Sequence, residues 1–398
     1  MTDTSAGNPI PANPAPGLYV HVPFCVRKCP YCDFYSVAPG ATADASAEAS
    51  TAAACDSTIR SWLNALTAEI ELYSSTFPAF DTLYIGGGTP SLLDERQITD
   101  LIRRLKAGFA FVEDTEITIE ANPDDIDPPR LAAYRELGIN RLSLGVQSFE
   151  DAELQFLRRR HDAAGAEAAL SHMRDAGFAN IGIDLIYGFQ GQSLASWERT
   201  LRRALEFTPE HLSCYQMTID PPTEFGRMLE AGSITAIDEE SQRKFFMATS
   251  ELLGARGYIH YEISNFARAE GFISRHNHKY WRHVPYLGLG PSAHSFHNGT
   301  RWWNERSVRG YCEALERGKS PVQNSETLTA DELALETLYL GFRTSEGVAI
   351  DDLRRYRSWE RALETLQRES LVTVEHGRAV PTLKGYLVAD RLPLAFTE

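Results

Sequence analysis

Three cysteines, Cys25, Cys29 and Cys32, lie close together directly after a short apolar run that begins at about Leu18. Their spacing, Cys-x3-Cys-x2-Cys, places three thiol groups on one loop, and thiolates are soft ligands that suit iron–sulfur clusters. Three protein ligands hold only three irons of a four-iron cluster. The spacing therefore favours an iron–sulfur site in which one iron is open to a ligand that is not protein.

Two other chemistries use clustered cysteines. A disulfide needs an oxidising compartment, and no basic-then-apolar secretory segment opens this chain. A structural zinc site needs four ligands, and the fourth here would be His21 or the distant Cys55. The cluster is favoured, and zinc stays open as the alternative.

Length and charge limit the class of protein. A chain of 398 residues accommodates one large domain and a smaller one. The net charge of −15 argues against a nucleic-acid-binding surface, which would be basic, and no apolar run approaches the length of a membrane span. We expect a cytoplasmic protein with no nucleic-acid partner and no transmembrane segment, and we leave peripheral membrane contact and a homodimer open.

The composition also divides the chain. Residues 1–17 are rich in Pro, Asn, Gly and Ala and are predicted to be a disordered tail. Residues 38–56 are almost wholly small or polar and are predicted to be a low-complexity, mobile insert. We expect the main domain to span 18–300 and a helical domain to span 301–398. The second domain contains two helix patterns and a hairpin candidate, an order that resembles a winged helix.

Six short β-branched segments alternate with helical patterns along the main domain, which predicts βαβ units and a parallel sheet. The expected strands begin near Leu18, Asp81, Glu116, Asn140, Asn180 and His211. Six units make an incomplete (β/α)6 barrel of the α/β class. In such barrels ligand groups gather at the carboxyl ends of the strands. This rule selects Gly87, Glu120, Gln147 and Asp184.

A dense histidine and aromatic region follows the last expected strand. It includes His276-Asn-His-Lys-Tyr-Trp281, with His294 further along the chain. Histidine is a common ligand of metals, including haem iron, and flat aromatic rings offer a surface to a porphyrin. His276 is thus the first candidate for a haem ligand, with His278, His294 and the remote Cys214 as alternatives. The competing interpretation is a hydrogen-bonded corner that closes the barrel.

Taken together, the motifs resemble the oxygen-independent coproporphyrinogen III oxidase family of the radical S-adenosylmethionine (SAM) superfamily. They are the cysteine motif, Gly-Gly-Gly-Thr-Pro, Glu-Ala-Asn-Pro, Gly-Val-Gln-Ser-Phe, Asp-Leu-Ile-Tyr-Gly and HNxxYW. The resemblance implies a [4Fe–4S] cluster on Cys25, Cys29 and Cys32. It also implies SAM contacts from Tyr19, Tyr31, Gly87, Gly88, Thr89, Glu120, Gln147, Arg159 and Asp184. The motif's usual glycine before Arg159 is Arg158 here.

One departure separates two branches of that family. The oxidase branch has a fourth cysteine two residues after the last ligand, where this chain has Phe34. Phenylalanine at this position and the HNxxYW motif resemble the HemW branch of radical SAM haem chaperones. That branch implies haem binding and delivery to haem-accepting proteins, with no coproporphyrinogen III dehydrogenase activity. Oxidative decarboxylation of coproporphyrinogen III, or another radical SAM reaction, remains the alternative.

The cysteine assignment predicts the metal content. After anaerobic reconstitution the protein should carry about four iron and four sulfide per chain. Replacing Cys25, Cys29 or Cys32 with Ala should abolish the cluster, because each loss leaves an iron without its thiolate. Replacing Cys55 or Cys214 should not. A zinc content near one per chain without iron would contradict the assignment.

Overall fold

The computed structural model describes residues 14–39 and 52–397. The largest hydrophobic core of these residues lies within the barrel unit, and a separate one is formed by residues from Leu338 to Phe396. In the described part of the chain, no helix is long and apolar enough to cross a membrane. Residues 1–13 of the expected tail and 40–51 of the expected insert lie outside the described residues.

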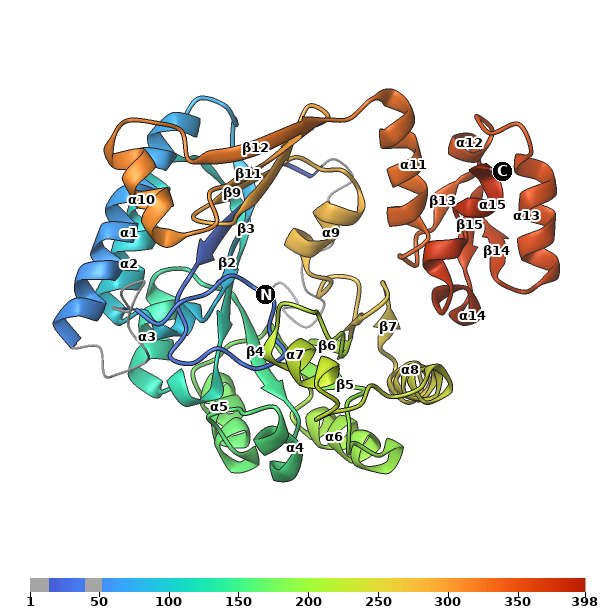
Figure 1. The fold of residues 1–398 in the computed structure, drawn as a ribbon, viewed down its shortest axis with the longest axis horizontal. Helices are drawn as coiled ribbons and strands as arrows, with labels where there is room; N and C mark the ends of the chain where they lie inside the picture. The colour runs from blue at the N-terminus through green and yellow to red at the C-terminus, as the bar shows by residue number, and fades with distance from the viewer. Residues whose placement is uncertain (1–13, 40–51, 398) are drawn as a thin grey trace, which may run out of the picture.

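Six parallel strands, each followed by helical structure, form the centre of the large sheet (Figure 1). The strands are β1 (Gly17–Val22), β2 (Phe80–Gly87), β3 (Phe111–Ala121), β4 (Arg141–Gln147), β5 (Ile181–Tyr187) and β6 (His211–Gln216). The helices between them are α1 (Ala52–Tyr73), α2 (Glu95–Gly108), α3 (Pro128–Glu136), α4 (Asp151–Phe156), α5 (Ala163–Asp175) and α6 (Leu194–Glu206). The sheet does not close on itself, so the expected incomplete (β/α)6 barrel is confirmed.

Both edges of this parallel core are extended by shorter strands. Antiparallel β8 (Asn265–Ala267) and β7 (Ile259–His260) follow β6, while β9 (Tyr286–Leu289) lies parallel to β1 on the other side. Antiparallel β10 (His294–His297), β11 (Thr300–Asn304) and β12 (Val322–Thr327) complete that edge. The helices of this part are α7 (Glu224–Glu230), α8 (Glu239–Gly254), α9 (Arg275–Trp281) and α10 (Val308–Glu316).

The smaller C-terminal unit lies beside the barrel (Figure 1). It contains α11 (Ala330–Gly341), β13 (Val348–Ala349), α12 (Ile350–Leu353), α13 (Trp359–Arg368), β14 (Val372–Glu375), β15 (Arg378–Pro381), α14 (Leu383–Tyr386) and α15 (Leu394–Thr397). Helices followed by the β14–β15 hairpin give the helix–helix–wing order. Because β11 and β12 still belong to the large sheet, we propose a domain boundary near residue 328 instead of 301.

Some residues expected to be irregular are built into the fold. The Ala15 amide donates to Asp81 Oδ2 at 3.1 Å, and Lys279 Nζ donates to the Ala15 carbonyl at 2.7 Å. Gly17 already belongs to β1. Residues 52–56 form the first turns of α1, because the helix continues into a face that packs on the core. The expectation that 14–17 and 52–56 lack structure is therefore wrong.

A buried carboxylate, Glu69 on α1, ties together three distant segments. It accepts hydrogen bonds from the Gly290 amide at 2.8 Å, Asn304 Nδ2 at 2.5 Å and the Tyr311 hydroxyl at 2.5 Å. Burial raises the pKa of Glu69 to about 7, and the three donors act against that shift. Glu69 therefore joins the first helix to the β9–β11 edge and to α10.

Replacing this carboxylate should destabilise the barrel. Glu69→Leu leaves the Gly290 amide and the Tyr311 hydroxyl without an acceptor and Asn304 Nδ2 with only the Gly290 carbonyl, and each unsatisfied buried donor costs about 1–3 kcal/mol. We expect the free energy of unfolding, measured by urea denaturation, to fall by about 3 kcal/mol or more. Glu71→Leu on an exposed position of the same helix is the matched control. Equal losses in the two variants would contradict the role assigned to Glu69.

Candidate cofactor site

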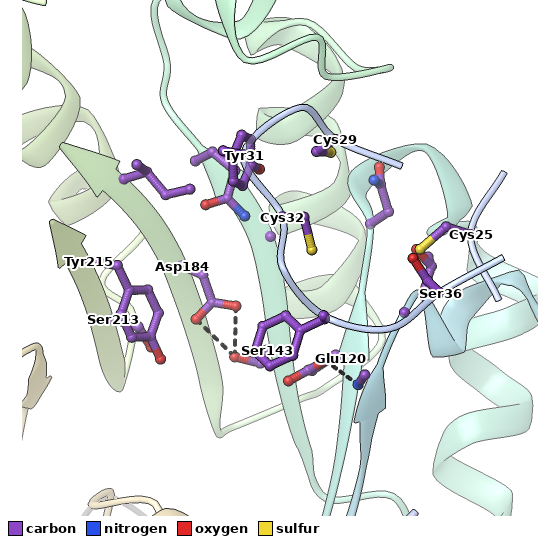
Figure 2. Close-up of a pocket in the computed structure, with 18 of the residues that line it drawn as sticks. Cys25, Cys29, Tyr31, Cys32, Ser36, Glu120, Ser143, Asp184, Ser213 and Tyr215 are labelled. Atoms are coloured by element: carbon purple, nitrogen blue, oxygen red, sulfur yellow. Dashed lines mark hydrogen bonds between the residues drawn. The ribbon is translucent and has the colours of Figure 1, made fainter. Parts of the chain in front are cut away.

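A cavity of about 510 Å³ occupies the interior of the barrel, with the cysteine loop over it (Figure 2). The expected site residues that line it are Cys25, Cys29, Tyr31, Cys32, Gly87, Gly88, Thr89, Glu120, Gln147, Arg159 and Asp184. Tyr19 and His276 do not line it. One cavity thus brings together residues from the four strands β2, β3, β4 and β5 and from the loop after β1.

The cavity exists because successive side chains along each strand point to opposite faces of the sheet. Leu18, Val20 and Val22 of β1 are buried in the apolar core, while the residues between them face the other side of the sheet. Barrel interiors are usually filled by branched apolar side chains. Here the inward positions of β3 to β6 are largely polar, and they leave space for a ligand.

The cysteine loop is fixed at both ends by backbone hydrogen bonds. The Cys25 amide donates to the Val37 carbonyl at 3.1 Å, and the Val37 amide donates to the Pro23 carbonyl at 2.9 Å. Within the described residues, no three His, Cys, Asp or Glu side chains converge closely enough to hold a single metal ion. A four-iron cluster has a different requirement, because each thiolate binds its own iron. Three separate sulfur atoms facing one cavity fit that requirement.

The glycine-rich turn after β2 holds this loop in place. The Gly88 amide donates to the Val22 carbonyl at 2.8 Å, and Thr89 Oγ1 lies 3.2 Å from Cys25 Sγ. A Cβ atom added to Gly88 would lie 2.6 Å from the Phe24 carbonyl oxygen. At Gly87, where φ is +107°, an added Cβ would lie 2.5 Å from the His21 ring. The glycines are therefore needed for the backbone approach itself as well as for access to the cavity.

Glu120 at the end of β3 is held by both of its oxygens. Tyr84 Oη donates to Oε1 at 2.8 Å, and the Gly87 amide donates to Oε2 at 3.0 Å. Burial raises the pKa of Glu120 to about 7, and the nearby Asp184 carboxylate adds to the rise. Within the described residues Glu120 has no ion-pair partner. A cationic ligand would supply one and would favour the charged carboxylate.

Asp184 at the middle of β5 is a half-buried residue and supplies the second carboxylate of the cavity (Figure 2). Ser143 Oγ lies 3.1 Å from each of its oxygens, and Ser213 also hydrogen-bonds to it. Burial raises the pKa of Asp184, while these hydroxyl groups lower it. Two carboxylates in one cavity suit a ligand with positive charge, as SAM has on its sulfonium and amino groups.

Arg159 places a positively charged guanidinium group in the cavity, and one of its N–H donors has no partner among the described residues. Its guanidinium donates to the Gly145 carbonyl at 2.7 Å and to Cys29 Sγ at 3.4 Å, whereas its buried Nε has no partner among the described residues. An unpaired buried donor is costly, so this position suits a ligand carboxylate. The preceding Arg158 has φ of +51°, a conformation that favours glycine, and its side chain pairs with Glu224 at 2.6 Å. Both arginines contact the cysteine loop, Arg159 through its guanidinium on Cys29 and Arg158 through its carbonyl, which accepts from Arg27 at 2.6 Å.

Several lining residues were missed from the sequence. Tyr84, Ser143, Ser213 and Tyr215 occupy inward positions on strands that were correctly expected. The two-residue period of β4, counted back from Gln147, gives Ser143. The same count from Gly87 on β2 gives the core residues Ile85 and Leu83 instead of Tyr84, and on β6 the sequence offers no selected strand-end residue from which to count.

The geometry argues against His276 as an exposed haem ligand. The residue is 1% exposed, and its Nδ1 and Nε2 lie 2.8 Å from Thr82 Oγ1 and 2.8 Å from Tyr280 Oη. Burial lowers the pKa of His276 to about 3, so the ring is neutral. The alternative interpretation, a hydrogen-bonded corner closing the barrel, matches this environment. Of the other candidates, His278 pairs with Glu346 at 2.9 Å, and Cys214 is buried in the barrel wall.

Comparison with known proteins agrees with this geometry. The radical SAM superfamily profile matches residues 19–204. Coproporphyrinogen III oxidase (HemN) from Escherichia coli, described as a radical SAM enzyme, superposes with a TM-score of 0.79 at 25% identity, over 96% of this chain and 90% of that one. The fold is that of a radical SAM protein.

Proteins with similar sequences identify the family within the radical SAM superfamily. Heme chaperone HemW of Mycobacterium tuberculosis is 34% identical over 96% of this chain and 94% of its own length. Heme chaperone HemW of Bacillus subtilis is 33% identical over 83% of this chain and 84% of its own length. The chain belongs to the heme chaperone HemW family.

The glycine turn gives a test of the site that needs neither SAM nor haem. Gly88→Ala would place a methyl group against the backbone of Phe24, so we expect the cysteine loop to shift. The iron content after anaerobic reconstitution should then fall well below the wild-type value of about four per chain. Gly254→Ala, at a helix position with no atom within 4 Å of the added methyl, should reconstitute normally. Full iron loading of Gly88→Ala would show that the close approach is dispensable.

Proposed function

We propose that the protein is a radical SAM haem chaperone, which binds haem and delivers it to haem-requiring proteins while carrying a [4Fe–4S] cluster and SAM. The observation that carries this proposal is Phe34. It occupies the position where the oxidase branch has a further cysteine, and it lines the same cavity as the three remaining cysteines.

The chain's own residues divide the work of holding the cofactors. Cys25, Cys29 and Cys32 would bind three irons. Glu120 and Asp184 would pair with the positive groups of SAM. Arg159 would receive the SAM carboxylate with its unused Nε, and Gly87 to Thr89 would keep the loop and β2 in contact. When bound, the cluster and SAM supply one-electron chemistry at this site.

The side chains at the mouth of the cavity favour the binding of an apolar ligand. Phe34 is 62% exposed and Val26 is 51% exposed, and both lie on the cysteine loop. Lys28 and Arg27 on the same loop also line the cavity. Exposed apolar side chains beside cations complement a porphyrin, which carries a flat apolar ring and anionic propionates.

Coproporphyrinogen III oxidation is the second candidate. The similarity to the Escherichia coli oxidase over 96% of this chain favours it. The side chain of Phe34 weighs against it, because an aromatic ring has no proton to give and no thiol chemistry. For the chaperone we further propose a cytoplasmic location and haem-accepting proteins as partners.

Parallel assays separate the two candidates. The anaerobically reconstituted protein is titrated with haem and followed by Soret absorbance. It is also incubated with coproporphyrinogen III, SAM and an electron donor, with the Escherichia coli oxidase as the positive control. We expect a saturable Soret shift near one haem per chain and no protoporphyrinogen IX. Catalytic formation of protoporphyrinogen IX, or no haem binding, would overturn the proposal.

A further inference from the structure

The histidine of the HNxxYW motif, His276, lies under the cofactor cavity on α9. The helix is fixed to the barrel by the Glu116 carboxylate, which accepts from the His276 amide at 3.1 Å, and by Lys279 Nζ, which lies 2.6 Å from Asp81 Oδ1. An added Cβ at Gly17 of β1 would lie 3.1 Å from the His276 ring, so the glycine permits this close packing.

The His276 ring belongs to a triangular cluster of three rings, in which it is stacked on Tyr84 and tilted against Tyr19. Its centroid lies 5.2 Å from that of Tyr84, at an interplanar angle of 29°, and 6.4 Å from that of Tyr19. The two tyrosine rings lie 6.2 Å apart. Hydrogen bonds to Thr82 and Tyr280 hold both nitrogens of the imidazole, so the ring cannot rotate freely.

Each tyrosine of this cluster makes a hydrogen bond to a residue near the cofactor site. Tyr84 Oη donates to Glu120, whose other oxygen accepts from the Gly87 amide. Tyr19 Oη lies 3.0 Å from His21 Nδ1, and His21 Nε2 lies 2.8 Å from the Tyr35 carbonyl at the end of the cysteine loop. The ring of His276 therefore supports both the carboxylate expected to meet SAM and the loop expected to hold the cluster.

We infer that His276 is a positioning residue for the SAM site, acting through Tyr84 on Glu120, and that it is not an iron ligand. This inference rests on the SAM site of the proposed function. The histidine of the HNxxYW motif would then support SAM binding instead of binding haem iron.

The test measures SAM affinity from the change that SAM causes in the EPR spectrum of the reduced cluster, with spectra normalised to iron content. His276→Leu removes the ring and both hydrogen bonds, and Tyr84→Phe removes only the bond to Glu120. Because bonds to charged groups are among the stronger ones, we expect each change to weaken SAM binding about tenfold. The double variant should be little weaker than either single variant, since both act through the same carboxylate.

Two further variants separate positioning from general damage. Thr82→Val removes one hydrogen bond of His276 with little change in volume, and it should also weaken SAM binding. It serves as the test variant if His276→Leu fails to fold. His278→Gln is the matched control, because His278 is buried on the same helix but bonds to Glu346 in the C-terminal unit. It should bind SAM like the wild type.

The outcomes separate this inference from the proposed function. No SAM-dependent EPR change in the wild type would contradict the proposed function itself. A normal wild-type response combined with unchanged SAM affinity in His276→Leu and Thr82→Val would overturn the positioning role. A Soret band lost in Thr82→Val and His276→Leu, with SAM affinity intact, would return His276 to the role of haem ligand.

Discussion

The close approach of two backbones, the end of β1 and the end of β2, is the contact on which the cofactor site depends. The Gly88 amide reaches the Val22 carbonyl, and there is no room for a side chain between them. Because the cysteine loop begins at the end of β1 and the cavity wall at the end of β2, this one contact sets their relative position. A side chain here would separate the thiols from the carboxylates by displacing a whole strand.

The same barrel keeps carboxylates where water is largely excluded. A buried charge without a partner is costly, and Glu120 and Asp184 are held by hydroxyl and amide donors. The positive charges of Arg141 and Arg159 also lower the pKa of Asp184. A cationic ligand would lower the remaining cost of ionising these two carboxyl groups.

Local patterns in the sequence were sufficient for the parallel barrel, for the cysteine loop and for four cavity-lining residues on the strands, Gly87, Glu120, Gln147 and Asp184. Strand alternation and the rule of strand ends depend on neighbouring residues only. Contacts between residues far apart in the sequence could not be predicted from such local patterns. His276 lies among aromatic residues whether it binds iron or closes a barrel, and only the fold shows its nitrogens bonded to Thr82 and Tyr280. Residues 52–56 have little apolar surface of their own, yet they open a helix whose later turns pack on the core.

The pairing of β1 with β9 has a consequence for how the chain is made. These neighbours are separated by most of the barrel sequence, since β1 ends at Val22 and β9 begins at Tyr286. A ribosome adds about 5–20 residues per second, so β1 waits many seconds for its second neighbour. During synthesis its open edge is a template for unwanted pairing with other nascent chains. The pairing of β1 with β9 is therefore a late event in the synthesis of this chain.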